Sequence, residues 1–257
     1  MKDTRWCTLY FKGDLNYFLA NDKPNNPIRY PLERRASVKD LIESLGPPHT
    51  EIGEIRANSR QVGFDFIVSG GDVLVVKPNV PPVDPCRSTI LRPEPLTGLR
   101  FVVDVNVGKV AMLLRSLGFD TAYHWTWRDR EIAALAHEEG RIVLSKDIGL
   151  LKRKKVTWGL FVRASEPDAQ LREVLDFFGL RPPFDLFSRC LRCNSLLRKV
   201  DKQAIIHRLE PKTRKYFQEF SICPDCRRIY WAGSHQEKLL HRIEAAVGGE
   251  SGDGQIV

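Results

Sequence analysis

Phe101-Val102-Val103-Asp104 decides the fold, because this stretch is a short buried strand that ends in a carboxylate. From Asn106, apolar residues recur at helical spacing until Gly118 ends the helix. Arg141-Ile142-Val143-Leu144 is the next apolar run, and it leads into Ser145-Lys146-Asp147. Strands that alternate with helices predict an α/β domain with a parallel sheet.

The same alternation continues through residues 99–187, with a helix from Thr126, a strand at 159–162 and a last helix that begins at Ser165. Before this domain, Pro78-Asn79-Val80-Pro81-Pro82-Val83-Asp84-Pro85 is unsuited to a helix or a central strand. We therefore predict an extended, proline-rich linker over residues 80–98.

Residues 1–79 predict a small β-grasp, which is an α+β domain. Strands are expected at 7–11 and 15–19, with a turn at Gly13 between them, and further strands follow the helix. Ser37 begins that helix with a capping box.

Four cysteines stand in two closely spaced pairs, namely Cys190, Cys193, Cys223 and Cys226. Two residues within each pair let both thiolates bind one ion, and four thiolates suit structural zinc. The 29 residues between the pairs are more than usual, but the cost of closing a loop grows slowly with length. The alternative is two disulfides, although Met1-Lys2-Asp3-Thr4-Arg5 precedes no apolar segment of a signal peptide. We expect a zinc ribbon at 188–245 and a flexible tail at 246–257.

Composition favours a cytoplasmic protein with a polyanionic partner. No apolar run reaches the roughly 20 residues that span a bilayer, so we expect no membrane association, and Cys7 and Cys86 are most simply reduced thiols. The net charge is +8, and residues 188–257 carry 13 basic and 8 acidic side chains, against 11 and 10 in residues 1–79. This excess indicates either nucleic acid binding or a solvated surface without a ligand.

Asp104 and Asp147 follow two strands of the predicted parallel sheet, and Asp129 stands at the start of the helix between them. The carboxyl ends of parallel strands share one edge, where ligands bind. Three carboxylates at one edge would bind Mg²⁺ or Mn²⁺, which can activate a water molecule and stabilise a leaving oxygen. Each residue also has a structural alternative: a helix cap for Asp104, a capping box with Thr126 for Asp129 and an Asx turn for Asp147.

Family resemblance adds to this interpretation. Residues 101–179 resemble the Mut-seven C-terminal RNase family, a group similar to PIN-domain nucleases that end in a zinc ribbon. The segments that carry the likeness are Val103-Asp104, Gly108-Lys109, Leu113 to Asp120, Glu138 to Asp147, Gln170-Leu171, the four paired cysteines, and Tyr230 to His235. Gly70-Gly71-Asp72 resembles the ubiquitin-like sulfur carriers of the ThiS and MoaD type, but the chain continues into the linker where carriers end in a free Gly-Gly tail.

The resemblance implies a hydrolase with a PIN-like fold that cleaves RNA with Mg²⁺ or Mn²⁺ at Asp104, Asp129 and Asp147, beside a structural Zn²⁺. Ser145-Lys146-Asp147 replaces the family's usual Thr-Arg-Asp, so a bidentate phosphate contact is lost. The substrate would be RNA, with transfer RNA and ribosomal RNA as candidates. The β-grasp is expected to lack carrier activity and to serve either as a packing module or as a binding module for a protein partner. We expect residues 1–80 to be dispensable for cleavage.

Basic and aromatic residues follow the predicted site. Lys146 and the run Lys152-Arg153-Lys154-Lys155 are candidates for binding phosphates. Trp125 and Trp127 could stack on bases or belong to the core, and Arg115 could contact substrate or form a structural salt bridge. The rival function is a non-catalytic RNA-binding or ribosome-associated protein that keeps the PIN-like fold.

Overall fold

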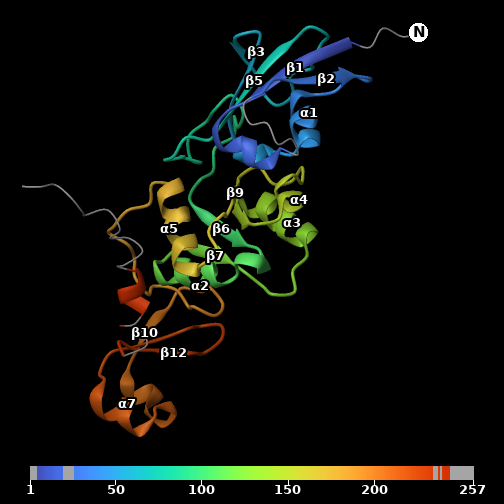
Figure 1. The fold of residues 1–257 in the computed structure, drawn as a ribbon. Helices are drawn as coiled ribbons and strands as arrows, with labels where there is room; N and C mark the ends of the chain where they lie inside the picture. The colour runs from blue at the N-terminus through green and yellow to red at the C-terminus, as the bar shows by residue number, and fades with distance from the viewer. Residues whose placement is uncertain (1–4, 20–25, 234–236, 238, 244–257) are drawn as a thin grey trace, which may run out of the picture.

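The computed structural model describes residues 5–19, 26–233, 237 and 239–243. Three sheets follow one another along the chain, with the first uppermost in Figure 1, the second in the middle and the third at the bottom. Among the described residues, no helix has the length and apolar character needed to cross a membrane.

The N-terminal sheet has the strand order β2-β1-β5-β3-β4. Its strands are β1 (Arg5–Phe11), β2 (Ile28–Leu32), β3 (Ile52–Ala57), β4 (Arg60–Gln61) and β5 (Val73–Pro78). β1 and β5 are parallel, and the other neighbours are antiparallel. Helix α1 (Val38–Leu45) begins at Ser37, whose hydroxyl accepts from Asp40 N in the predicted capping box. The arrangement confirms the β-grasp.

The predicted strand at 15–19 is wrong. A 3-10 helix, η1 (Gly13–Phe18), occupies this segment, and β2 comes only after it. Leu15 and Phe18 are both buried, whereas Tyr17 is exposed. A separation of three residues between buried side chains fits a 3-10 turn rather than the period of two that defines a strand.

The middle sheet is fully parallel, with the order β7-β6-β8-β9. Its strands are β6 (Arg100–Val103), β7 (Asp120–Ala122), β8 (Ile142–Ser145) and β9 (Gly159–Phe161). Its helices are η3 (Val105–Val107), α2 (Lys109–Ser116), α3 (Asp129–Glu139), α4 (Ile148–Leu151) and α5 (Pro167–Phe177). Apolar side chains of α2 and α5 share one core with the sheet, and those of α3 and α4 share the other. The predicted α/β fold is confirmed, with a helical layer on each face (Figure 1).

The β-grasp packs against the outer edge of β9. The carboxylate of Glu51, in η2 (His49–Glu51), accepts from Phe161 N at 2.8 Å and from the Arg163 guanidinium at 2.9 Å. The predicted linker contains no helix or strand, yet it is tied to both domains. Arg92 is buried and donates to three β-grasp carbonyls and to Thr157 O of the middle domain.

The C-terminal sheet consists of the antiparallel strands β10 (Arg198–Val200), β11 (Phe220–Ile222) and β12 (Ile229–Tyr230). The long segment between the cysteine pairs also forms α6 (Lys202–Ile205), η4 (Ile206–Arg208) and α7 (Pro211–Tyr216). Its buried apolar residues, Ile205, Leu209 and Phe220, form a separate small core. This core is too small to stabilise the module alone, so a metal is expected to contribute.

Candidate active site and metal centre

Asp104 is buried at the carboxyl end of β6, with 6% of its surface exposed. One carboxylate oxygen accepts from Val105 N at 2.6 Å, so Asp104 caps η3 as the structural alternative expects. The other oxygen accepts from the Asn106 amide at 2.7 Å and from the Ser145 hydroxyl at 2.7 Å. Ser145 is the last residue of β8, and these bonds therefore join two strand ends.

Asp147 lies at the same edge and is connected to Asp104 through Ser145. Its backbone N donates to the Ser145 hydroxyl at 2.8 Å. Its side chain accepts from Gly149 N and Leu150 N through a single oxygen, Oδ1, and thereby caps α4. Asp147 is exposed, and both of these hydrogen bonds use the same carboxylate oxygen.

Asp129 is the first residue of α3 and forms an ion pair with Arg153 at 3.2 Å. The capping box with Thr126 is absent, because the Glu131 carboxylate closes the helix start by accepting from Arg128 N. Within the part of the chain that the structure describes, the three aspartates form no group whose ligand oxygens all lie within 4.8 Å. The structure therefore connects Asp104 and Asp147 through Ser145, whereas Asp129 forms an ion pair with Arg153.

Sequence reasoning missed Asn106 and the bridging role of Ser145. The Asn106 side chain also accepts from Lys146 N at 3.1 Å, so it ties the residues after β6 to those after β8. These two strands are neighbours at the point where the strand order reverses, which is where open parallel sheets bind ligands. The sequence signal that could have identified them is their position, since Asn106 and Ser145 each stand two residues from a strand-end aspartate.

The predicted RNA-binding residues differ in exposure and in contacts. Lys152 is turned toward the β-grasp, where its ammonium donates to Glu43 O at 2.6 Å, and burial lowers its pKa. Arg153 pairs with Asp129, and Lys154 and Lys155 are exposed. Lys146 is half-buried between the two strand ends. Of these cations, Arg153 lies at the start of α3, and Lys154 lies near Lys39 of the β-grasp.

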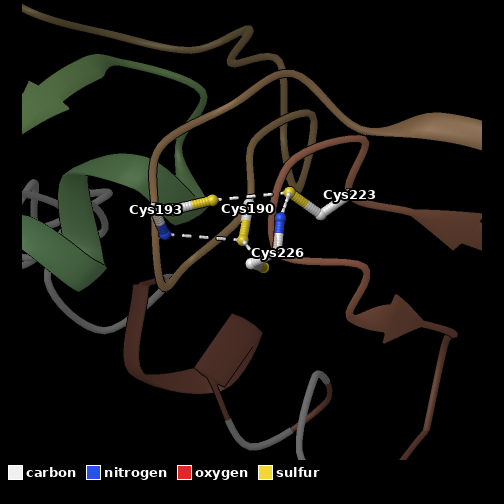
Figure 2. Close-up of side chains that lie close together, drawn as sticks. All are labelled: Cys190, Cys193, Cys223 and Cys226. Atoms are coloured by element: carbon white, nitrogen blue, oxygen red, sulfur yellow. Dashed lines mark hydrogen bonds between the residues drawn. The ribbon is translucent and has the colours of Figure 1, made fainter.

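The four paired cysteines converge (Figure 2). All four sulfur atoms lie within 4.8 Å of one another, with Cys190 and Cys226 3.5 Å apart and Cys193 and Cys223 3.4 Å apart. Sulfur atoms bound to one tetrahedral zinc at about 2.3 Å are roughly 3.8 Å apart, so the donor set fits this ion. The cysteines are free thiols, which is consistent with metal binding rather than with the disulfide alternative.

The two knuckles have the same local geometry. Cys193 N points to Cys190 Sγ at 3.5 Å, and Cys226 N points to Cys223 Sγ at 3.4 Å. The residue after each pair, Asn194 or Arg227, has a positive φ (75° and 59°), which turns the chain back around the sulfur atoms. His235 lies outside the described residues.

The environment shifts the pKa values of two of these thiols in opposite directions. Burial acts to raise the pKa of Cys193, but hydrogen bonds with the hydroxyl and backbone of Ser195 lower it to about 6. Burial raises the pKa of Cys226 to about 12. Zinc binds the thiolate form, so binding of the ion would release protons from this group of cysteines.

Together, these features define an α/β protein with a polar strand-end site, a β-grasp before it and a four-cysteine ribbon after it. Residues 99–243 match the Mut7-C RNAse domain, and residues 5–84 match the Mut7-C ubiquitin domain. The first match covers more than half of the 257 residues, and the chain belongs to the Mut7-C RNAse domain family. No curated protein and no solved structure matched the chain.

Proposed function

We propose that the protein is a Mg²⁺- or Mn²⁺-dependent ribonuclease. The observation that carries this proposal is the link from Asp147 through Ser145 to Asp104, at the point where the strand order of the sheet reverses. Carboxylate and hydroxyl oxygens are ligands that both metals prefer. The family match to an RNAse domain supports the same reaction.

In this proposal Asp104 and Asp147 hold the cation, and Ser145 and Asn106 fix their positions. Asp129 is the third carboxylate, and it would exchange its pairing with Arg153 for the metal. The bound metal would supply a water nucleophile and stabilise charge on the leaving oxygen. Arg153 would then be free to contact phosphate, with Lys146, Lys152, Lys154 and Lys155 as the other proposed RNA contacts.

We also propose that the domain limits follow the sequence: β-grasp at 1–79, linker at 80–98, nuclease domain at 99–187, ribbon at 188–245 and tail at 246–257. The ribbon would bind zinc and add RNA affinity, since exposed basic residues such as Arg198, Lys212 and Arg214 lie on it or its insertion. The tail lies outside the described residues. The β-grasp uses one face against the nuclease domain, so a protein partner would bind elsewhere on it.

A non-catalytic RNA-binding protein is the second candidate. It is favoured by the caps that Asp104 and Asp147 form, because those hydrogen bonds give both carboxylates a structural role without a metal. In that case the site would retain the shape of a nuclease, and the exposed cations would provide the function.

The test is cleavage of labelled RNA by zinc-containing protein in buffers with Mg²⁺, Mn²⁺ or neither. Asp104→Asn, Asp129→Asn and Asp147→Asn should each lower cleavage by at least about a hundredfold, since each removes a charged ligand from the metal. RNA binding should be kept or slightly strengthened, because each change removes negative charge. The matched control is Asp176→Asn, an exposed carboxylate near the C-terminal end of α5 that pairs with Arg181.

Metal-dependent cleavage that disappears in all three site variants and persists in the control supports the ribonuclease. If the parent binds RNA but never cuts it above the rate with metal alone, the ribonuclease proposal fails and the binding protein becomes the better explanation.

A further inference from the structure

The loop between β7 and α3 places its two tryptophans in opposite environments. Trp125 has 72% of its surface exposed, whereas Trp127 is half-buried and packs against the core that α3 shares with the sheet. A water-exposed indole is costly because apolar surface favours burial. The structure therefore separates the two sequence alternatives: Trp127 anchors the loop and Trp125 is available to a ligand.

The loop is fixed on both sides of Trp125. At its start, Tyr123 packs over Gly108, where an added Cβ would lie 2.6 Å from the Tyr123 hydroxyl oxygen. His124 lies nearly parallel to Trp125, with an angle of 22° between the rings and 6.2 Å between their centroids. The His124 ring is itself held by the Thr126 hydroxyl at 2.7 Å. The His124 ring, which Thr126 holds in place, therefore supports the exposed Trp125 ring.

This loop leads directly into the candidate site. Parallel strands place the end of β7 at the same edge as Asp104 and Asp147, and four residues after Trp125 the chain reaches Asp129. The Asp129–Arg153 ion pair brings the basic run after α4 to this point. Two further exposed cations, Arg128 and Arg130, stand directly before and after Asp129 in the chain. An exposed aromatic ring beside a row of cations is the arrangement that binds single-stranded nucleic acid.

We propose that Trp125, supported by His124, is a stacking platform for a base of single-stranded RNA next to the phosphodiester at the Asp104–Asp147 site. The proposal rests on RNA being the ligand of the proposed function, and it assigns the single-stranded form as the substrate class. Bases in a duplex already stack on each other and would leave the indole unoccupied.

Binding is measured by fluorescence anisotropy with a labelled oligoadenylate and with a duplex of the same length, in buffer without Mg²⁺ or Mn²⁺. Trp125→Ala should weaken oligoadenylate binding about 5- to 150-fold, which corresponds to the loss of one stacked base. Trp125→Phe keeps a ring and should stay within about threefold of the parent. Duplex binding should not change. Trp6→Ala, an exposed indole on β1, is the matched control and should bind like the parent.

A second measurement guards against a misfolded variant. Bound oligoadenylate should quench the protein's tryptophan fluorescence, and the well-folded Trp125→Phe protein should lose most of that quenching while still binding. Unchanged oligoadenylate affinity in Trp125→Ala, or an equal loss for duplex, overturns the platform even if the protein cleaves RNA. If the parent protein shows this stacking but cleaves no RNA, the stacking platform is supported and only the ribonuclease proposal fails.

Discussion

Arg115 shows how a buried charge can join two domains. It lies on α2 with 4% of its surface exposed, and burial lowers the pKa of its guanidinium. Its Nε donates to Thr121 O at 2.8 Å. Its Nη1 donates to Leu191 O and Arg192 O, within the first cysteine pair, at 3.0 and 2.8 Å. From the sequence, Arg115 could either contact substrate or form a salt bridge. In the structure, the hydrogen bonds of Arg115 go to backbone carbonyls.

Replacing Arg115 with Met should lower the free energy of unfolding by about 3 kcal/mol, because buried carbonyls lose their donors. Zinc should also be released faster to a chromogenic chelator, since two of those carbonyls belong to the knuckle. Urea denaturation and zinc-release rates test this. Arg181→Met is the control: its ion pair with Asp176 is exposed, so the loss should stay below about 1 kcal/mol. Equal effects of the two substitutions would contradict the structural role of Arg115.

At the scale of elements, the middle sheet has two outer strands, and each is protected by a neighbouring domain. Glu51 of the β-grasp accepts from Phe161 N on β9. On the opposite side, the side chain of Asn194, which follows the first cysteine pair, accepts from Thr121 N on β7 at 2.9 Å. Unpaired edge groups promote association between chains, so these side chains also protect against aggregation.

This arrangement connects the four-cysteine group to the middle sheet. Removing zinc with a strong chelator should accelerate hydrogen exchange at the Thr121 amide by at least about tenfold, because Asn194 follows the ligand Cys193 directly and is held by the knuckle. The amide of Val143, in central β8, should keep its protection. Elemental analysis of never-chelated protein should first show one zinc per chain. Unchanged exchange at Thr121 after zinc loss would show that the knuckle keeps its place without metal.

Local sequence signals predicted helices and strands well where a full cap or a full apolar run was present. The capping box of α1 formed as expected, and Gly140 ends α3 with a positive φ. The strands β6 and β8 were recognised because their apolar runs are buried on both sides. β7 and the strands of the ribbon were missed, because two or three residues give too little pattern to separate a strand from a loop.

At the scale of the whole molecule, the β-grasp and the nuclease domain share a core. Phe18 packs edge-on against Phe161 with 5.2 Å between ring centroids, and His49 contacts Val156 O at 2.6 Å. Buried residues of the two domains belong to one apolar cluster. No sequence pattern predicted this shared core. Hydrophobic periodicity indicates which face of an element is buried, but it does not indicate which domain covers that face. The placement of Asn106 and Ser145 around Asp104 was hidden for the same reason, since it depends on contacts between distant residues.

The shared core changes the expectation that residues 1–80 are dispensable. Deleting residues 1–79 should expose the apolar surface around Phe161 and leave Phe161 N without its acceptor, so the product should aggregate or melt at least about 10 °C below the parent. Differential scanning fluorimetry and size-exclusion chromatography measure this. Arg92→Met in the full chain should cause a smaller decrease by removing donors between the domains. Deletion of residues 246–257 is the control and should leave the melting temperature unchanged. A monomeric 80–257 protein that melts like the parent would mean that the nuclease domain and ribbon are stable alone, with the β-grasp as an appended module.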